Sequence, residues 1–363
     1  MSLSKKFTTL FVVILLLSIV YTLSGIETGN YYTKFQSDDA NDLNFMLYWS
    51  QEYFIQGRYN YFVTWGSLGI MLLLQLFVEI AKTHDFTIIA FGIIMWFIIR
   101  DYFRMHVYEL RRFHWILFIL VLAGSLTYIT IPGKGSLSFI TFYLALKYLH
   151  KGNLIYLIGA LVLAGLNRPV EILVIFACLI YIKQSLKKRV LWSAFILLSL
   201  IVAPLVGSLV ADYLGLDIFD KSKMSNNFGS YSFLWNTNAV VNFLLAPLRL
   251  LAVSVSVVSS SIYSWGELLR IIDEPGYFYW RIFPIMLRLV SGLYLIYAVS
   301  LIILRLRYFL FSSKIPRTVV FAVMYFVIYG YMITINGVEE KSRYFLLFPI
   351  MLMPVMCYVR KRI

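Results

Sequence analysis

Long apolar runs recur along the whole chain and are separated by short polar or basic stretches. Clear examples cover residues 7–24, 113–131, 190–211, 283–304 and 318–335. With 61% hydrophobic and 14% charged residues, the chain is more apolar than an average soluble domain. A bilayer core takes roughly 20 apolar helical residues per crossing, so the pattern predicts an all-α, polytopic transmembrane protein with about ten crossings plus re-entrant or interfacial helices.

Basic residues at both ends of the chain predict its orientation in a membrane. Lys5 and Lys6 precede the first apolar run, and Arg360, Lys361 and Arg362 follow the last one. Because cytoplasmic segments are enriched in lysine and arginine, both termini are expected in the cytoplasm. The net charge of +14 is then explained by orientation and by anionic headgroups, and a nucleic-acid partner is not predicted.

The long polar loops are expected on the outer face. In this arrangement residues 1–363 form a single transmembrane domain, and the loops 25–58, 212–238, 263–282 and 336–343 make up an active-site face. These loops carry most of the acidic residues, whereas the loops on the opposite, cytoplasmic face are short and basic, among them 100–112 and the run from Lys183 to Arg189. The tyrosine and tryptophan rings of the loops 212–238 and 263–282 either stack on sugars or anchor these loops at the membrane interface.

Two adjacent acids follow the first apolar run. Asp38 and Asp39 lie in the run Ser-Asp-Asp-Ala-Asn-Asp of the first outer loop. They either solvate that loop or act as a general base that accepts the proton of a sugar hydroxyl. Ionisable groups at the edge of a membrane are costly, and this cost favours a functional reading.

Cations in three other places are candidates for binding phosphate. Lys134 lies between glycines in a Pro-Gly-Lys-Gly-Ser turn, and it either extends to the headgroups or binds phosphate. Arg168 lies in the break Asn-Arg-Pro between the apolar segments 154–166 and 170–182, because proline disfavours helix at the preceding residue. Arg343 either anchors the last outer loop or binds phosphate through its guanidinium fork. The remaining candidate substrate-binding residues are in outer loops, namely Arg270, Glu339 and Tyr344.

Several other kinds of site have no support in the sequence. The four histidines lack metal-ligand spacing, and neither a phosphate-binding loop for ATP nor a dinucleotide glycine fingerprint occurs. Cys178 and Cys357 lie inside apolar runs and are expected to be small buried hydrophobes. No cofactor is therefore predicted, while a divalent metal remains an open alternative.

Taken in order, these motifs resemble the integral-membrane glycosyltransferases of the C-type (GT-C) fold and the bacterial O-antigen and capsule repeat-unit polymerases. The likeness rests on the outer acidic loop, Pro-Gly-Lys-Gly-Ser, Asn-Arg-Pro, and Lys-Ser-Arg-Tyr followed by Phe-Pro near the C-terminus. The resemblance implies a polyprenyl-phosphate or pyrophosphate donor at the outer face of the bacterial inner membrane. It also implies that Asp38 or Asp39 is the base and that Arg168 and Arg343 hold the phosphates. Lys134 stands where many C-type enzymes have an acid, which argues against a metal-dependent mechanism.

The expected function is therefore transfer of a sugar or oligosaccharide from a polyprenyl-linked donor to an acceptor glycan, with polymerisation of a surface polysaccharide as the task. The expected partners are that donor, the acceptor glycan, the lipid bilayer and a chain-length regulator protein. A flippase or transporter of lipid-linked oligosaccharide is the alternative. It would place its charged residues near the bilayer midplane, whereas the unusual polar residues here are expected on one face.

Overall fold

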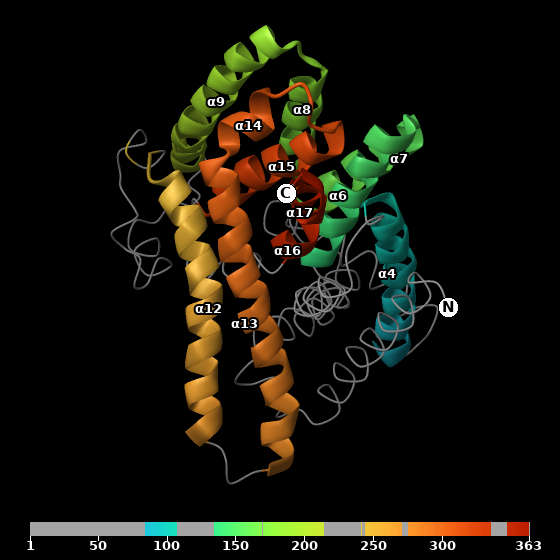
Figure 1. Cartoon of the computed structure of the whole chain (residues 1–363), viewed down its shortest axis with the longest axis vertical. Helices are drawn as coiled ribbons and strands as arrows, with labels where there is room; N and C mark the ends of the chain where they lie inside the picture. The colour runs from blue at the N-terminus through green and yellow to red at the C-terminus, as the bar shows by residue number, and fades with distance from the viewer. Residues whose placement is uncertain are drawn as a thin grey trace. The chain divides into compact units, whose positions relative to one another are not determined.

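The computed structural model describes residues 84–106, 134–168, 170–213, 241, 244–270, 275–334 and 347–362, and the elements in these ranges are helices (Figure 1). Their bounds are α4 His84–His106, α6 Lys134–Lys151, α7 Leu154–Asn167, α8 Val170–Lys183, α9 Leu186–Tyr213, α12 Ala246–Arg270, α13 Pro275–Leu304, α14 Leu306–Phe311, α15 Arg317–Thr334, α16 Phe348–Met351 and α17 Met353–Arg362. Their order largely follows the apolar runs of the sequence.

The chain divides into two compact units. Unit 1 comprises Met1–Leu173 and Ser264–Leu287, and unit 2 comprises Val174–Tyr263 and Arg288–Ile363. The polar cluster at the break between α7 and α8 lies in unit 1, so this unit holds the candidate site.

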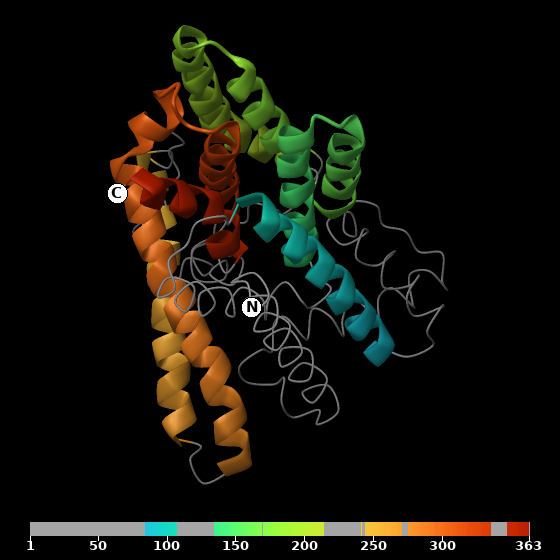
Figure 2. The same cartoon turned by 45° about the vertical axis from the view of Figure 1, so that its right-hand side comes forward.

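In unit 1, α6 and α7 form a helical hairpin (Figure 2). The two helices are joined by Gly152 and Asn153. Gly152 has a φ of +73°, the left-handed conformation that ends a helix at low cost for glycine, and its N–H donates to the Tyr148 carbonyl at 2.7 Å. Asn153 then begins α7, because its side-chain oxygen accepts the Ile155 N–H at 3.0 Å. Local capping therefore determines where the hairpin turns.

In the core of unit 1, aromatic side chains pack against α6 from α4, and small side chains pack against it from α7. Tyr102 of α4 is fully buried and meets the ring of Phe139 edge to face, with 5.5 Å between ring centroids. On α7, Ala160 and Ala164 are fully buried, and their small side chains let α6 and α7 approach closely. This packing fixes α6 against both α4 and α7.

Unit 2 is built around α15, which contacts α14, α16 and α17. Phe321, Tyr325 and Tyr329 recur at four-residue intervals, so they lie along one face of α15, and all three are buried. Phe348 at the start of α16 joins the row, with its ring centroid 6.1 Å from that of Tyr329. This aromatic row forms a continuous part of the buried core in the described part of the unit.

The predicted transmembrane architecture is wrong for the part of the chain that the structure describes. No helix in that part is both long and apolar enough to cross a membrane. Two physical reasons can be seen in individual helices. The 14-residue helices α7 and α8 reach only about 21 Å each, at roughly 1.5 Å per residue, against a bilayer core of about 30 Å. The longer α12 instead carries polar residues, including the buried Arg249.

Two predicted loops also differ from the observed elements. The basic segment 100–112 was expected to be a loop, yet α4 continues through Arg100 and Arg104 to His106. In the predicted loop 263–282, α12 extends to Arg270 and α13 begins at Pro275. In both places the charged residues led to the prediction of a loop. Long charged side chains are nevertheless compatible with a helix whose other positions are apolar.

Candidate functional site

The predicted break between the two short apolar helices is confirmed. Helix α7 ends at Asn167, α8 begins at Val170, and Arg168 between them has an extended backbone with φ −146° and ψ 98°. The Arg168 N–H donates to the Ala164 carbonyl at 2.8 Å, and the Arg168 carbonyl accepts the Glu171 N–H at 2.8 Å. Both backbone groups of Arg168 are thus held in place. Its side chain is partly buried.

Three buried polar side chains surround this break, and we call Ser138, Asn167 and Glu171 the break cluster. Ser138 Oγ donates to Glu171 Oε1, and Asn167 Nδ2 donates to Ser138 Oγ at 3.1 Å. Each of the three residues is 0% exposed. A buried carboxylate is costly unless it is hydrogen-bonded, so the hydrogen bond from Ser138 stabilises the buried Glu171 side chain.

The break cluster joins two motifs that are distant in the sequence. Ser138 belongs to α6, whose first residue is Lys134, while Asn167 and Glu171 flank the Asn-Arg-Pro break. The structure therefore brings the first turns of α6, which follow the Pro-Gly-Lys-Gly-Ser motif in the sequence, against the Arg168 turn. Ser136 and Thr141 of α6 are also buried, so this part of α6 is unusually polar for a core helix.

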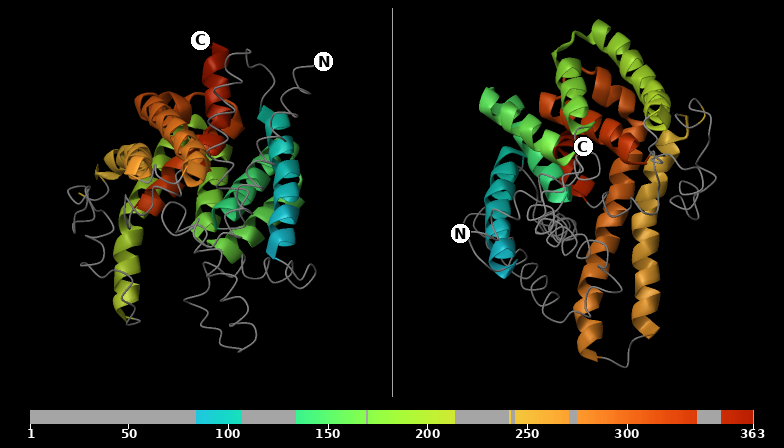
Figure 3. Two further views of the ribbon diagram at one scale, coloured as in Figure 1. Left: turned by 90° about the horizontal axis from the view of Figure 1, so that it is seen from below. Right: turned by 180° about the vertical axis from the view of Figure 1, so that it is seen from behind.

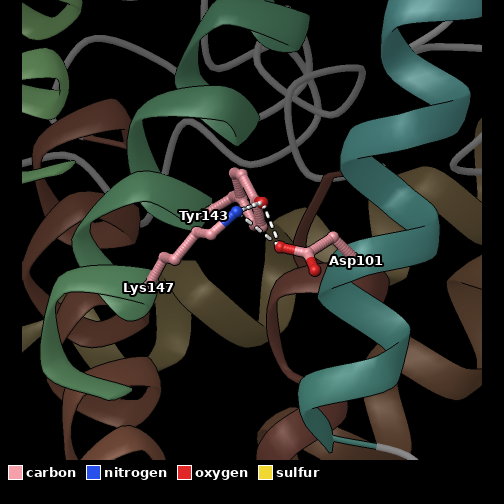
Figure 4. A network of polar contacts seen from close by, with 3 residues as sticks. All are labelled: Asp101, Tyr143 and Lys147. Atoms are coloured by element: carbon pink, nitrogen blue, oxygen red, sulfur yellow. Dashed lines mark hydrogen bonds and ion pairs between the residues drawn. The ribbon is translucent and has the colours of Figure 1, made fainter. Parts of the chain in front are cut away.

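A second polar network links α4 to α6 in unit 1 (Figure 4). Lys147 Nζ lies 2.6 Å from Asp101 Oδ2 and donates to Tyr143 Oη at 2.6 Å. Tyr143 Oη in turn donates to Asp101 Oδ2 at 2.5 Å. The Lys147 ammonium also lies over the Tyr156 ring of α7, 4.9 Å from its centroid, so one cation connects three helices.

The network shifts the pKa of all three groups. Burial acts to raise the pKa of the Asp101 carboxyl, but hydrogen bonds from Lys147 and Tyr143 outweigh it and leave that pKa below its usual value. Burial acts to lower the pKa of Lys147, and its bonds to Asp101 and Tyr143 raise it instead. Burial and the bond to Asp101 raise the pKa of Tyr143 to about 12. Around neutral pH the network therefore consists of a carboxylate, a neutral phenol and an ammonium.

We expect the Asp101 contribution to stability to disappear in acid. Because the folded-state pKa of Asp101 is lowered, its contribution is complete above the usual carboxyl pKa of about 4 and is lost as pH falls through the lowered value. At pH 7, Asp101→Asn should reduce the free energy of unfolding by less than about 1 kcal/mol, because the partly exposed carboxylate is screened by water. Urea titrations between pH 7 and pH 2 would measure the difference.

The matched control for Asp101→Asn is Arg104→Gln, which changes an exposed charge on the same helix. The free energies of Asp101→Asn and the unchanged chain should converge at low pH, whereas the difference for Arg104→Gln should not follow this carboxyl titration. A difference for Asp101→Asn that is constant down to pH 2 would contradict the ion-pair explanation.

Unit 2 holds a buried cation of its own. Arg249 of α12 is 0% exposed, and its guanidinium carbon lies 5.6 Å from the centroid of the Tyr331 ring. Burial lowers the pKa of Arg249, and the neighbouring Tyr331 opposes that effect. Burial likewise raises the pKa of Tyr331, which Arg249 opposes. The pair is a cation–π contact in the core of this unit.

The structure describes only some of the predicted site residues. Arg168 lies at the break, as expected. Lys134 is the first residue of α6, and Arg270 is the last residue of α12 rather than part of a loop. The side chains of these two residues are outside the described part of the structure, as are the following residues in their entirety: Asp38, Asp39, Glu339, Arg343 and Tyr344. Their predicted convergence on Arg168 stays a prediction.

Sequence reasoning missed Glu171 and Ser138. Glu171 was read as part of an apolar segment, although a lone carboxylate inside such a run is itself a signal that a buried partner must exist. Ser138 gave no comparable signal, because serine is common in helices of every kind. Asp101 was equally overlooked, since it lies within a stretch that was assigned to a basic loop.

Among the described residues, no group of three or more histidine, cysteine, aspartate or glutamate side chains could hold a metal ion. Comparison with known protein families, with curated proteins and with solved structures found no match to this chain.

Proposed function

We propose that the chain is a glycosyltransferase that uses a polyprenyl-phosphate- or pyrophosphate-linked sugar or oligosaccharide, and that its task is polymerisation of O-antigen or capsule repeat units. The observation that supports this proposal is the break cluster, which holds the Arg168 turn against the helix that begins at Lys134. A cation in a helix break that packs against the first turns of the helix beginning at Lys134 suits a phosphate leaving group.

In the proposed reaction, Asp38 or Asp39 accepts the proton of the acceptor hydroxyl. The acceptor oxygen then forms a bond to the anomeric carbon of the donor, and the bond from that carbon to the phosphate oxygen breaks. The phosphate leaves with the bonding electron pair, and Arg168 stabilises its charge together with Lys134 and Arg343. The protein thus accepts a proton from the acceptor hydroxyl and stabilises the charge on the leaving phosphate.

The lipid-linked donor also determines the proposed partners and the proposed location of the reaction. The donor's lipid tail would bring the chain to the bacterial inner membrane, where a bilayer, an acceptor glycan and a chain-length regulator would be its partners. Arg270, Glu339 and Tyr344 would contact the saccharide.

The proposal is tested with the purified full chain and a panel of radiolabelled undecaprenyl-pyrophosphate-linked oligosaccharides. We expect longer glycan products and release of undecaprenyl pyrophosphate. Arg168→Ala should lower the rate by about tenfold or more, because it removes a charge-assisted hydrogen bond to the leaving group. Asp38→Asn and Asp39→Asn, made separately, should abolish product in at least one case.

Arg307→Ala is the matched control, since Arg307 is exposed and removal of its charge should leave the rate unchanged. Equal rates for Arg168→Ala and Arg307→Ala would remove Arg168 from the site. Movement of the lipid-linked oligosaccharide across liposome membranes without any glycan extension would instead support the flippase alternative and overturn the proposal.

A further inference from the structure

We propose that the break cluster acts as a positioning device for Arg168, so that Ser138, Asn167 and Glu171 control how the Arg168 guanidinium meets the donor's phosphate. This inference rests on the proposed role of Arg168 in phosphate binding. It adds three residues to the site that act through Arg168 and do not themselves touch the substrate.

The hydrogen bonds of the break cluster run in one direction. The Asn167 amide donates to Ser138 Oγ, and the Ser138 hydroxyl, which has a single hydrogen, donates to Glu171 Oε1. The Ser138 hydroxyl is therefore both acceptor and donor, and neither bond can be kept if this oxygen is removed. One atom of α6 thus connects the last residue of α7 with the second residue of α8.

The residues that the cluster anchors are the ones on either side of Arg168. Asn167 precedes it directly, and Glu171 follows three residues later. The backbone of Arg168 is bonded at both ends, to Ala164 and to Glu171. A rotation of the Arg168 turn would therefore have to break a backbone bond and pull at least one buried side chain away from Ser138. These restraints give the turn a single orientation relative to α6.

Orientation matters because phosphate recognition by a guanidinium depends on geometry. Bidentate hydrogen bonds need the plane of the fork aligned with two phosphate oxygens, and a misplacement of about 1 Å can cost on the order of 100-fold in rate. A cluster that stabilises only the fold would affect unfolding alone. A positioning cluster affects phosphate binding as well, and only when Arg168 is present.

The test measures binding of inorganic pyrophosphate to the purified full chain by calorimetry, alongside kcat and KM for donor cleavage. Ser138→Ala should weaken pyrophosphate binding by roughly tenfold, because the Arg168 turn is no longer held. Glu171→Gln should bind within about twofold of the unchanged chain, since the glutamine oxygen still accepts the Ser138 hydrogen. Glu171→Met, which has a similar volume and lacks that acceptor, should behave like Ser138→Ala.

The decisive variant combines Ser138→Ala with Arg168→Ala. If Ser138 acts through Arg168, the double variant binds pyrophosphate no more weakly than Arg168→Ala alone. An undiminished Ser138→Ala effect in the Arg168→Ala background overturns the inference, and so does normal binding by Ser138→Ala. If Ser138→Ala does not fold, as judged by circular dichroism, Glu171→Met in both backgrounds replaces it.

The outcomes separate this inference from the proposed function. When Arg168→Ala lowers binding and cleavage but the cluster variants do not, the proposed role of Arg168 stands and only the positioning device is lost. When Arg168→Ala changes neither binding nor cleavage, the proposed role of Arg168 fails first, and the inference falls with it.

Discussion

Replacing Arg189 by alanine is expected to lower the free energy of unfolding of unit 2 by about 2–3 kcal/mol. The guanidinium of Arg189 donates to three backbone carbonyls: Nε to Gln184, Nη1 to Leu310 and Nη2 to Ile182, each at 3.3 Å. The Ile182 and Leu310 carbonyls lie in the last turns of α8 and α14, and Gln184 directly follows α8. At such helix ends acceptors lack helical partners, and the helix dipole favours a cation. Loss of Arg189 would leave them without this donor.

Two control variants make the Arg189 prediction specific. Lys188→Ala removes an exposed charge from the same turn of α9 and should change the free energy of unfolding by no more than about 0.5 kcal/mol. Arg189→Lys should be intermediate, because one ammonium group does not reproduce the three-way fork. Urea unfolding gives the energies, and faster amide hydrogen exchange at the end of α8 locates the effect. Equal stability of Arg189→Ala and Lys188→Ala would show that the carbonyl contacts contribute nothing.

The basic run from Lys183 to Arg189 also illustrates what the sequence could and could not predict. The sequence predicts a short cytoplasmic loop for this run. Lys187 and Lys188 are indeed exposed, but both lie inside α9, and Arg189 turns toward two helix ends. The sequence gives no reason to distinguish Arg189 from Lys187 and Lys188. The Leu310 carbonyl, which Arg189 binds and the lysines do not, is more than a hundred residues away in the chain.

Local rules predicted the helix break well. Proline at 169 disfavours helix at the residue before it, and α7 accordingly ends at Asn167. The break cluster was beyond local rules, since it pairs Ser138 with a glutamate 33 positions later. Hydropathy likewise located most of the apolar helices in the described part of the chain, but no helix in that part is long and apolar enough to cross a bilayer. Apolar character alone does not distinguish a buried helix from a membrane span.

The close approach of α12 and α13 leads to the second large prediction. In their unit 2 portions the two helices run side by side (Figure 3). Gly292 of α13 lies at the contact with Val257 and Val258 of α12. A Cβ atom at position 292 would lie 2.8 Å from Val258 Cγ2, 3.0 Å from Val257 Cγ1 and 3.3 Å from the Val258 backbone nitrogen. The valine methyl groups can shift a little, whereas the backbone atom cannot move without displacing α12. Gly292 is thus required by space, not by backbone conformation.

We therefore expect Gly292→Leu to lower the free energy of unfolding by about 3 kcal/mol and Gly292→Ala by about 1 kcal/mol, because both overpack the contact. Gly165→Ala in α7 is the matched control: the nearest atom to its new Cβ would be Ile172 Cδ1 at 3.6 Å, which is ordinary contact. There the better helix propensity of alanine should stabilise by up to about 1 kcal/mol. The two alanine substitutions should thus shift the urea midpoint in opposite directions. A rise in the midpoint for Gly292→Ala would mean that α12 and α13 can separate freely at this position.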